Sequence, residues 1–478
     1  MELRHLRLFR HGFAVAWLIV QVSCVTAPRT VRRKQSSDGL SGGGHLALAT
    51  FRCTAVAAVR QPVTTVKLGF AFLWHHPLQI IHGNLPFAAT PKPAIAQAPG
   101  TREFETLLDH HHFPRAESGS LHWLIDGSRF FPELEHRISA ARRSIKMQTF
   151  IFDNDDIAVR YADALKRRSG EVQVQVLFDD LGSMIAANTA PATLGPCGFD
   201  PPPDMHDYLR DHSKVRARRI LTPWLAADHT KLFIFDKRIA YLGGMNIGRE
   251  YFSEWHDLMA RVEGPIVNSL CREFNRAWRK AGPWGDFALV RNPAIFRRPR
   301  PVKADIPLRV LRTDPAEDRH EILDACLLAI RGAHRRIWIE TPYFMNAEVA
   351  QTLEAAAHRG VDVRVIIPGS HESPILNAAN LATADGLVRG GARVYRYPIM
   401  THTKVMICDD WACIGSANLD NLSLRVNREL NLAFFNRAAV QELADKVLLP
   451  DFRRSSVIPL AETGPYANGF VRTIADQL

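Results

Sequence analysis

The sequence predicts an α/β protein in which one α/β unit occurs twice. Three observations predict this fold class. Residues 141–152 resemble residues 333–344, so the chain contains a weak internal duplication. Each copy continues with a helical pattern and then a strand pattern, an order typical of βαβ units and of a largely parallel or mixed sheet. Each copy also ends in the same short polar motif.

The two copies are expected to contain the same elements in the same order. The repeated segment comprises the end of a helix and a buried strand. A helix follows, over residues 157–168 in the first copy and 347–359 in the second. Alternating apolar residues then predict a strand over residues 172–176 and its counterpart over 361–365. Continuous apolar runs predict two further buried strands, over residues 232–235 and 405–408.

Length and composition exclude several classes of protein. The chain has 478 residues, enough for two to four ordinary domains or for one large duplicated domain. Its 46% hydrophobic and 23% charged residues exclude a wholly disordered, collagen-like or small disulfide-stabilised protein. No run of 18 uninterrupted apolar residues occurs, which excludes a polytopic membrane protein. The seven cysteines include no Cys-x-x-Cys pair, and we expect buried free thiols.

The positive charge is concentrated at the N-terminus. Residues 1–100 contain eleven basic and two acidic residues, a net charge of +9 out of +11 for the chain. The other 378 residues contain 49 basic and 47 acidic residues, a net charge of +2. We therefore interpret the excess charge as a targeting or membrane-surface feature rather than as a nucleic-acid footprint.

Residues 1–100 are expected to form an N-terminal extension. Basic residues precede an apolar stretch over residues 13–25, a pattern typical of a secretory signal or anchor, with cleavage near Ala27 or lipidation at Cys24. Four basic residues directly after the stretch argue against export, and a poorly ordered extension without a targeting role is the alternative. A second apolar patch, over residues 68–81, either lies on a membrane surface or packs on the body.

A Pro- and Ala-rich linker over residues 85–100 indicates that the folded body starts near Thr101. Residues 291–303 are rich in Pro and Arg and form the best candidate for a boundary between the halves. We therefore expect a first half over residues 101–300 and a second over residues 301–478.

The repeated polar motif carries the chemistry. It reads His229-Thr230-Lys231, Asp236 and Gly243-Gly244-Met245-Asn246 in the first half, and His402-Thr403-Lys404, Asp409 and Gly415-Ser416-Ala417-Asn418 in the second. Residues i and i+2 of a strand share a face, so each half projects an imidazole beside an ammonium group. If the halves pack around a pseudo-twofold axis, two histidines and two lysines meet at one site, joined by one asparagine from each half.

Such a cluster of cations requires an anion, because two neighbouring ammonium groups repel each other and lose solvation. A phosphate would accept hydrogen bonds from the lysines and from the phosphate-binding candidates Asn246, Ser416 and Asn418. One histidine would attack phosphorus to give a covalent phosphohistidine, and the other would protonate the leaving oxygen. The lysines supply the positive charge that this chemistry needs, and we expect no metal or other cofactor.

The carboxylates near the motif fall into two groups. Asp236 and Asp409 each follow their lysine by five residues, an odd offset that points them away from the site on a continuous strand. We interpret both as turn carboxylates at strand ends. Asp257 and Glu429 lie farther along the chain, and each could accept a hydrogen bond from an imidazole Nδ1–H and hold its tautomer.

These residues resemble the phospholipase D superfamily, whose HKD signature is His-x-Lys-x4-Asp. Both copies match the signature, so the resemblance implies a catalytic set of His229, Lys231, Asp236, His402, Lys404 and Asp409. Residues 243–248, 262–265 and 415–420 also look like the family, and residues 340–344 with 359–364 are especially similar to bacterial cardiolipin synthases. The similarity covers about residues 120–450.

The resemblance implies a duplicated bilobal α/β fold, with two mixed-sheet lobes flanked by helices and one active site at their interface. By family analogy His229 is the nucleophile and His402 the acid/base, an order that the sequence alone leaves open. Two features depart from the family. Five residues separate Asp409 from Gly415, against six between Asp236 and Gly243, which requires a tighter turn. Residues 1–100 do not match the two transmembrane helices typical of one cardiolipin synthase type.

The leading hypothesis is a phosphatidyltransferase or phospholipase D that acts on glycerophospholipids, as in cardiolipin synthesis from two phosphatidylglycerol molecules. With water as acceptor the same intermediate gives phosphatidic acid. A nuclease is the alternative; basic patches at residues 210–219 and 297–303 favour it, and the near-neutral body argues against it. Intact motifs argue against an inactive scaffold. We expect a phospholipid partner at the bacterial cell membrane and no obligate protein partner, with export or lipid anchoring through the N-terminal segment.

Overall fold

The computed structural model of the chain describes residues 42–73, 92–189, 193, 195–223, 226–288, 305–369 and 373–466. The expected signal or anchor over residues 13–25 and the expected boundary over residues 291–303 lie outside these ranges.

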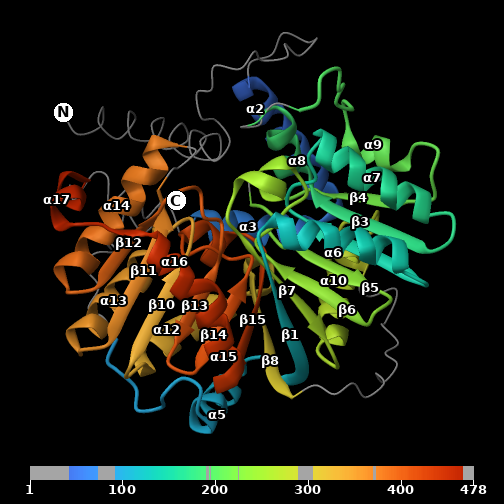
Figure 1. Cartoon of the computed structure of the whole chain (residues 1–478). Coiled ribbons are helices and arrows are strands. Elements are labelled where there is room, and N and C mark those ends of the chain that lie inside the picture. The colour runs from blue at the N-terminus through green and yellow to red at the C-terminus, as the bar shows by residue number, and fades with distance from the viewer. Residues whose placement is uncertain are drawn as a thin grey trace.

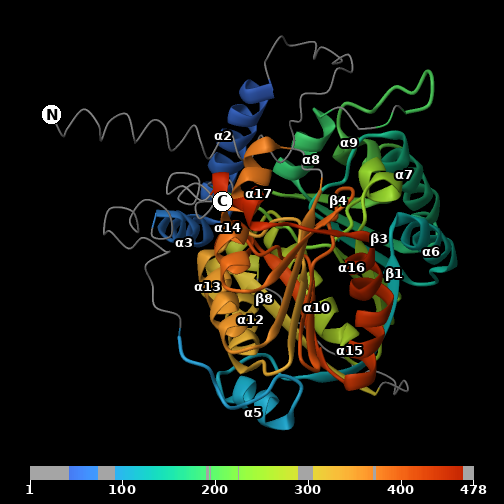
Figure 2. The same cartoon turned by 60° about the vertical axis from the view of Figure 1, so that its left-hand side comes forward.

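One mixed sheet runs through both halves of the described chain (Figures 1 and 2). The strands of the first half are β1 (Glu117–Ile125), β2 (Ser144–Thr149), β3 (Gln173–Asp179), β4 (Arg216–Ile220), β5 (Leu232–Phe235), β6 (Ile239–Gly243) and β7 (Leu258–Glu263). Those of the second half are β8 (Ile306–Asp314), β9 (Arg319–His320), β10 (Arg336–Glu340), β11 (Asp362–Pro368), β12 (Arg393–Tyr397), β13 (Val405–Cys408), β14 (Trp411–Gly415), β15 (Glu429–Phe435) and β16 (Ser456–Val457).

The strand order makes the duplication visible. Outward from the centre, the first half has the order β1-β7-β6-β5-β2-β3-β4 and the second half the order β8-β15-β14-β13-β10-β11-β12. In each half the outer three strands are parallel and the inner neighbours antiparallel. Strands β1 and β8 pair antiparallel at the centre. The predicted duplicated α/β fold is confirmed, and its two lobes share one sheet about a pseudo-twofold axis.

Helices pack against the sheet in both halves (Figure 1). The first half has α5 (Arg102–His110), α6 (Gly127–Ala140), α7 (Asp156–Arg168), α8 (Asp180–Ala187), α9 (Met205–Arg210) and α10 (Val267–Lys280). The second has α12 (Glu321–Gly332), α13 (Ala347–His358), α14 (Pro374–Arg389), α15 (Arg437–Leu443), α16 (Leu449–Arg454) and α17 (Leu460–Thr463). Two π-helices, η3 (Glu250–Glu254) and η6 (Leu422–Val426), occupy corresponding places in the two halves.

The sequence patterns explain the elements that carry the repeat. Helices α7 and α13 match the expected ranges because each has a side-chain cap: Asp155 accepts from the Ala158 N–H and Asn346 from the Val349 N–H. Every residue of β5 and β13 is buried, as their continuous apolar runs predict. Both strands therefore lie inside the protein, and the motif that precedes them is held between the two halves.

The expected tighter turn is present in the second half. Strand β5 is joined to β6 by three residues, Asp236 to Arg238, whereas β13 is joined to β14 by two, Asp409 and Asp410. The difference of one residue is confined to this turn. After it the two halves have the same register, because Gly243 pairs with Met259 in β7 and Gly415 pairs with the corresponding residue of β15, Asn431. The shorter turn therefore leaves the following asparagine in its equivalent place.

Residues 42–73 and 92–100, the described part of the first hundred residues, pack on the body more extensively than the sequence predicts. Helices α2 (Gly42–Arg60) and α3 (Pro62–Leu73) precede the expected start near Thr101 and bury Cys53, Ala57 and Leu68 against the remainder of the described chain. The expected linker also makes contact, since the Arg331 guanidinium donates to the Pro93 carbonyl over 2.7 Å. The extension therefore contributes to the folded unit. No helix within the described ranges is long and apolar enough to cross a membrane.

All six described cysteines are free thiols, as predicted, and all but one are buried. Cys53, Cys271, Cys326, Cys408 and Cys413 are buried and unbonded, whereas Cys197 is exposed. Cys24 lies outside the described residues.

Candidate active site

Each His-x-Lys segment lies in an extended stretch immediately before a buried strand and pairs there with the opposite half. The backbone N–H of His229 donates to the Arg428 carbonyl over 2.8 Å, and that of His402 donates to the His256 carbonyl over 2.7 Å. Arg428 and His256 directly precede Glu429 and Asp257. This pairing of main chains therefore brings each histidine beside the carboxylate that the other half supplies.

The two histidines are held by these carboxylates in a crossed arrangement. His229 Nδ1 lies 2.9 Å from Glu429 Oε1, and His402 Nδ1 lies 2.7 Å from Asp257 Oδ2. The four side chains are all buried. A carboxylate at Nδ1 fixes the proton there and leaves Nε2 with its lone pair. The site is therefore complete only when both halves of the duplication are present.

The two lysines lie among the histidines with their ammonium groups tied to the backbone. Lys231 Nζ donates to the His229 carbonyl over 2.7 Å, and Lys404 Nζ donates to the His402 carbonyl over 2.6 Å. Burial lowers the pKa of Lys404 to about 7. Burial likewise lowers the pKa of Lys231 well below its ordinary value, and Lys404 lowers it further. Each ammonium group has further donors, and an anion between them would restore their full charge.

The same burial keeps both imidazoles neutral. It lowers the pKa of His229, with Lys231 and Lys404 acting in the same direction against Glu429. It lowers the pKa of His402 well below the ordinary value, and both lysines and His229 lower it further. The hydrogen bonds that join each histidine to a carboxylate of the other half and each lysine to its histidine's carbonyl hold these four groups where the two halves meet. A neutral imidazole with a free Nε2 is the form that can attack phosphorus.

The two orienting carboxylates differ in their own environments. Burial raises the pKa of Asp257 to about 7, although Lys404 opposes the shift. Burial also acts to raise the pKa of Glu429, but His229 and Lys231 outweigh it and the net shift is downward. Ser416 Oγ donates a further hydrogen bond to Glu429 Oε2. Glu429 is thus the more firmly ionised of the two.

The asparagines and the serine expected to bind phosphate lie at the same cluster of segments. Asn246 Oδ1 accepts from the Thr149 hydroxyl and from the Ile151 N–H, and its buried Nδ2 has no hydrogen-bond partner within the described residues. Asn418 is buried as well. The hydroxyl proton of Ser416 is directed at Glu429, so the structure gives Ser416 a place in holding the carboxylate. Phosphate binding by these three side chains stays a prediction.

Asp236 and Asp409 lie in the turns after β5 and β13 and have positive φ angles of 53° and 52°. Asp236 accepts from the backbone N–H groups of Arg142, Arg143 and Ser144. Asp409 accepts in the same way from residues 334–336. Each carboxylate therefore anchors the start of the neighbouring antiparallel strand, β2 or β10, and does not contact the histidines.

Sequence reasoning missed the aromatic walls of the site. The ring of Phe150 lies 4.8 Å from that of His229, and the Lys231 ammonium lies 5.2 Å from the centre of the same phenyl ring. The rings of Tyr251 and Trp255 lie 5.4 Å and 5.3 Å from that of His402. These rings cover one side of each imidazole with apolar surface. No sequence motif predicts these aromatic residues, because their contacts with the histidines form only when η3 and the end of β2 are folded.

Sequence reasoning also missed a layer of polar side chains behind the histidines. Arg428 Nη1 lies 2.7 Å from Asp228 Oδ2, next to His229. On the other side, His256 lies 2.7 Å from Asp126 and 3.1 Å from Asp451 through its two nitrogens. Residues of both groups directly precede the catalytic candidates in the sequence. The positions of Asp228, His256 and Arg428 directly before these candidates were the sequence signal that could have identified them.

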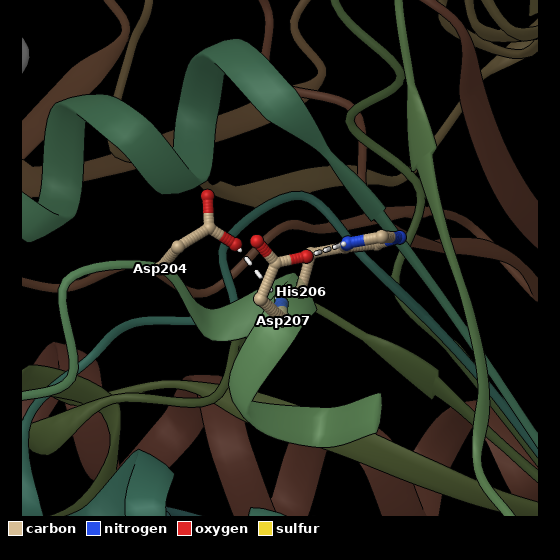
Figure 3. A group of neighbouring side chains, drawn as sticks. All are labelled: Asp204, His206 and Asp207. Atoms are coloured by element: carbon tan, nitrogen blue, oxygen red, sulfur yellow. Dashed lines mark hydrogen bonds and ion pairs between the residues drawn. The ribbon is translucent and has the colours of Figure 1, made fainter. Parts of the chain in front are cut away.

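A further group of titratable side chains lies at the start of α9. Asp207 contacts His206 over 2.8 Å, and its N–H donates to Asp204 over 3.0 Å (Figure 3). Asp204 is also paired with Arg219. The acidic charges of this group are thus largely matched by hydrogen-bond donors, and it shares no residue with the histidine–lysine cluster.

Comparison with known proteins agrees with this geometry. A family model described as "Cardiolipin synthase, PLD-like domain" matches residues 134–278 and 327–448, which include every histidine, lysine and carboxylate of the site. Cardiolipin synthase A of Pseudomonas entomophila is 32% identical over 390 residues, which cover 77% of each chain. The major cardiolipin synthase ClsA of Bacillus subtilis is 29% identical over 347 residues, which cover 70% of each chain.

A solved structure shares the fold. The crystal structure of phosphatidylserine synthase from Haemophilus influenzae superposes with a TM-score of 0.59 at 15% sequence identity, and the match covers 77% of this chain and 95% of that one.

Proposed function

The chain belongs to the cardiolipin synthase family with a phospholipase D-like domain, and from that premise we propose that it is a phosphatidyltransferase that passes a phosphatidyl group from one phosphatidylglycerol molecule to another. The observation that carries the proposal is the crossed pair of histidines, each held at Nδ1 by a carboxylate of the other half. Two oriented, neutral imidazoles beside two buried lysines suit a two-step displacement at phosphorus.

In the first step, Nε2 of one histidine attacks the phosphorus of phosphatidylglycerol. The bond between phosphorus and the head-group glycerol oxygen breaks, and the second histidine gives that oxygen a proton. Glycerol leaves, and the phosphatidyl group remains bound to nitrogen as a phosphohistidine. We assign the attack to His229 and the proton transfer to His402, following the resemblance to the family.

In the second step, a hydroxyl of another phosphatidylglycerol molecule replaces glycerol. His402 takes the proton of this hydroxyl as its oxygen attacks phosphorus, and the bond to His229 breaks. The products are cardiolipin and the free enzyme. Water in place of the hydroxyl would give phosphatidic acid instead. The aromatic rings of Phe150, Tyr251 and Trp255 favour transfer, because they restrict water near both imidazoles.

Charge stabilisation in both steps is assigned to the lysines and asparagines. The phosphoryl oxygens gain negative charge in each transition state, and Lys231 and Lys404 provide the matching positive charge in a buried site. The Asn246 amide offers a buried donor that no described residue uses. Phospholipids are presented in bilayers, and we therefore propose that the enzyme works at the surface of the bacterial membrane.

The test is incubation of the purified protein with phosphatidylglycerol vesicles and, separately, with single-stranded DNA. We expect cardiolipin and glycerol in equal amounts. Phosphatidic acid as the main lipid product would replace transfer with hydrolysis, and DNA cleavage without lipid turnover would refute the lipid function. The variants His229→Ala and His402→Ala should both lose turnover with unchanged thermal unfolding. Substantial residual turnover in either variant would contradict the two-histidine mechanism.

A further inference from the structure

The N-terminal helices expose an apolar stripe on their outer side. In α2, Phe51 and Val59 are 73% and 80% exposed and lie on the same helix face as the exposed Ala55 and Ala58. In α3, residues 63, 66 and 70 follow the same helical spacing, and Val66 is 72% exposed. An ordinary surface helix turns its apolar stripe inward. These two helices bury one set of residues and present a second apolar set to the outside.

A neighbouring segment adds two exposed aromatic side chains beside the junction of the two helices. Trp284 and Phe287 are exposed and flank Asp286, which accepts hydrogen bonds from the backbone N–H and the hydroxyl of Thr64 over 2.9 Å and 2.6 Å. Gly285 has a φ of 48° and packs against the last carbonyl of α2, where a Cβ atom would lie 1.7 Å from the oxygen. The segment is therefore locked onto the junction of α2 and α3.

The exposed apolar residues of the two consecutive helices and of the segment held at their junction are here called the α2–α3 face: Phe51, Val59, Val63, Val66, Phe70, Trp284 and Phe287. They are seven of the eleven large apolar side chains that the described residues expose, so the exposed apolar surface is concentrated here. Figure 2 shows both helices on the outside of the molecule. Apolar patches of this kind mark contacts with a partner or a membrane.

The charged residues of the α2–α3 face indicate which kind of partner it binds. Helices α2 and α3 contain no acidic residue, and their charged residues are Arg52, Arg60 and Lys67. Arg52 is paired with Asp180, whereas Arg60 and Lys67 are exposed at the apolar stripe. Asp286, the acidic residue of the neighbouring segment, is engaged by Thr64. An apolar stripe bordered by basic side chains fits the surface of an anionic bilayer, where apolar groups enter the interface and cations meet lipid phosphates.

The buried side of the same helices packs on segments that lead to the active site. Leu68 packs with Ala226, two residues before Asp228, and with Val426 at the end of η6. The neighbour of Asp180, Asp179, accepts from the Asp228 N–H over 3.0 Å. The α2–α3 face is thus joined through single packing contacts to the segment that carries His229.

We propose that the α2–α3 face docks the enzyme on an anionic phospholipid bilayer, with Phe51, Val59, Val63, Val66, Phe70, Trp284 and Phe287 inserted among the lipid head groups. This docking holds the histidine–lysine cluster near the lipid surface. The inference rests on the proposed function for its choice of a lipid partner, and binding can be tested without turnover.

The test measures co-sedimentation of the full chain with vesicles. The variant Val59→Ser/Val66→Ser removes two of the most exposed side chains of the stripe, and Val457→Ser is the matched control because Val457 is 56% exposed in β16, at the end of the second half. With vesicles of equal parts phosphatidylglycerol and phosphatidylcholine, we expect the double variant to bind roughly tenfold more weakly than the parent and the control to bind unchanged. Pure phosphatidylcholine vesicles should also bind the parent more weakly.

A second measurement follows Trp284 directly. Its fluorescence should shift to shorter wavelength with phosphatidylglycerol vesicles, and Trp284→Phe should remove that shift. The same variants should turn over phosphatidylglycerol in detergent micelles at the parental rate. Equal vesicle binding by the parent and the double variant would overturn the proposal. A change in oligomeric state without loss of vesicle binding would assign the face to a second copy instead.

The outcomes separate this inference from the proposed function. Vesicle binding by the inactive His229→Ala variant, at the parental strength, supports docking irrespective of chemistry. Vesicle binding without cardiolipin formation would refute the proposed reaction but would still support the α2–α3 face as the membrane-docking surface. Parental thermal unfolding of the serine variants shows that a loss of binding is not a loss of fold.

Discussion

Replacement of Asp257 by asparagine tests the role of the crossed carboxylates most sharply. Both oxygens of Asp257 are committed: Oδ1 accepts from the Leu258 N–H over 2.7 Å, and Oδ2 accepts from His402 Nδ1 over 2.7 Å. Asparagine has the same shape but a single oxygen. That oxygen must stay on the Leu258 N–H, because an amide NH2 group there would leave two donors facing each other in a buried site.

The consequence for His402 is a change of tautomer. With the amide NH2 facing it, Nδ1 becomes the acceptor and the proton moves to Nε2, so that Nε2 can no longer accept a proton from the incoming hydroxyl. In Ser-His-Asp triads the same substitution reduces kcat about 10⁴-fold for this reason. We expect a loss of about 10³- to 10⁴-fold in turnover here, or about 4–5 kcal/mol of transition-state stabilisation at 1.36 kcal/mol per factor of ten.

The matched control is Glu429→Gln, whose surroundings can adapt. Glu429 Oε1 faces His229, and Oε2 receives the Ser416 hydroxyl. In the glutamine variant the oxygen can remain on His229 while the amide donates to Ser416 Oγ. The Ser416 hydroxyl can then donate to the Leu430 carbonyl, whose oxygen already lies 3.4 Å from Ser416 Oγ. The tautomer of His229 is kept and only the charge is lost, so a smaller loss of about 10- to 100-fold is expected.

The assay is the initial rate of glycerol release from phosphatidylglycerol vesicles, with thermal unfolding as the control for the fold. The expected order is parent, then Glu429→Gln, then Asp257→Asn, with at least a tenfold gap between the two variants. Retention of more than a tenth of the parental rate by Asp257→Asn would refute the tautomer argument. An equal or larger loss in Glu429→Gln would refute the proposed role of Ser416.

The remaining predictions concern protons. Because burial raises the pKa of Asp257 to about 7, its carboxyl becomes a donor below that pH, and kcat/KM should fall as the pH drops below about 7; a flat acid limb would contradict this. Anion binding should restore the charge of Lys404, whose pKa burial lowers to about 7, so calorimetry of inorganic phosphate binding at pH 8 should show proton uptake that Lys404→Met reduces; the remaining uptake belongs to Lys231, whose pKa burial also lowers. Burial alone would lower the pKa of His256, but Asp126 and Asp451 raise it to about 11. Its charge therefore stabilises the fold fully below its unfolded pKa of about 6.5, and this stability is lost as the pH rises toward 11. Denaturant unfolding between pH 7 and 10 should show a smaller decline in His256→Gln than in the parent.

The local part of the site was predictable from the sequence. The repeat located the histidines and lysines, and the odd offset of Asp236 and Asp409 from their lysines excluded them from the histidines' face. That argument held because each strand continues straight from its motif into a turn, where the carboxylate meets the start of the next strand. Asp257 and Glu429 were predictable as orienting groups because triad chemistry requires an acceptor at Nδ1.

The crossing of the halves was not predictable. His229 and Glu429 are 200 residues apart, and a single sequence contains no signal that assigns each carboxylate to one of two equivalent histidines. The packing of α2 and of the first half of α3 was missed for another reason, whereas packing on the body was one of the two alternatives for the patch that begins at Leu68. Their sequences are apolar on two sides, so no clear periodicity separates the buried from the exposed stripe, and their Ser- and Pro-rich flanks indicated an extension instead of two packed helices. The junction of the lobes through β1 and β8 likewise depends on a contact between distant segments.

The polar groups behind the histidines show how the duplicated frame supports two different roles. Equivalent places are occupied by Gln148, Asp228 and Arg428 behind His229, and by Glu340, Thr401 and His256 behind His402. The backbone pairing is the same in both halves, but the carboxylate lies beside the histidine in the first and on the neighbouring strand in the second. Each set contains one carboxyl group and one basic side chain, but Asp228 is ion-paired with Arg428, whereas burial raises the pKa of Glu340 to about 8, so the charges behind the two histidines differ. Two histidines in identical backbone settings therefore need not be chemically identical, and a displacement at phosphorus requires that difference, because one imidazole must hold the phosphoryl group while the other carries the proton.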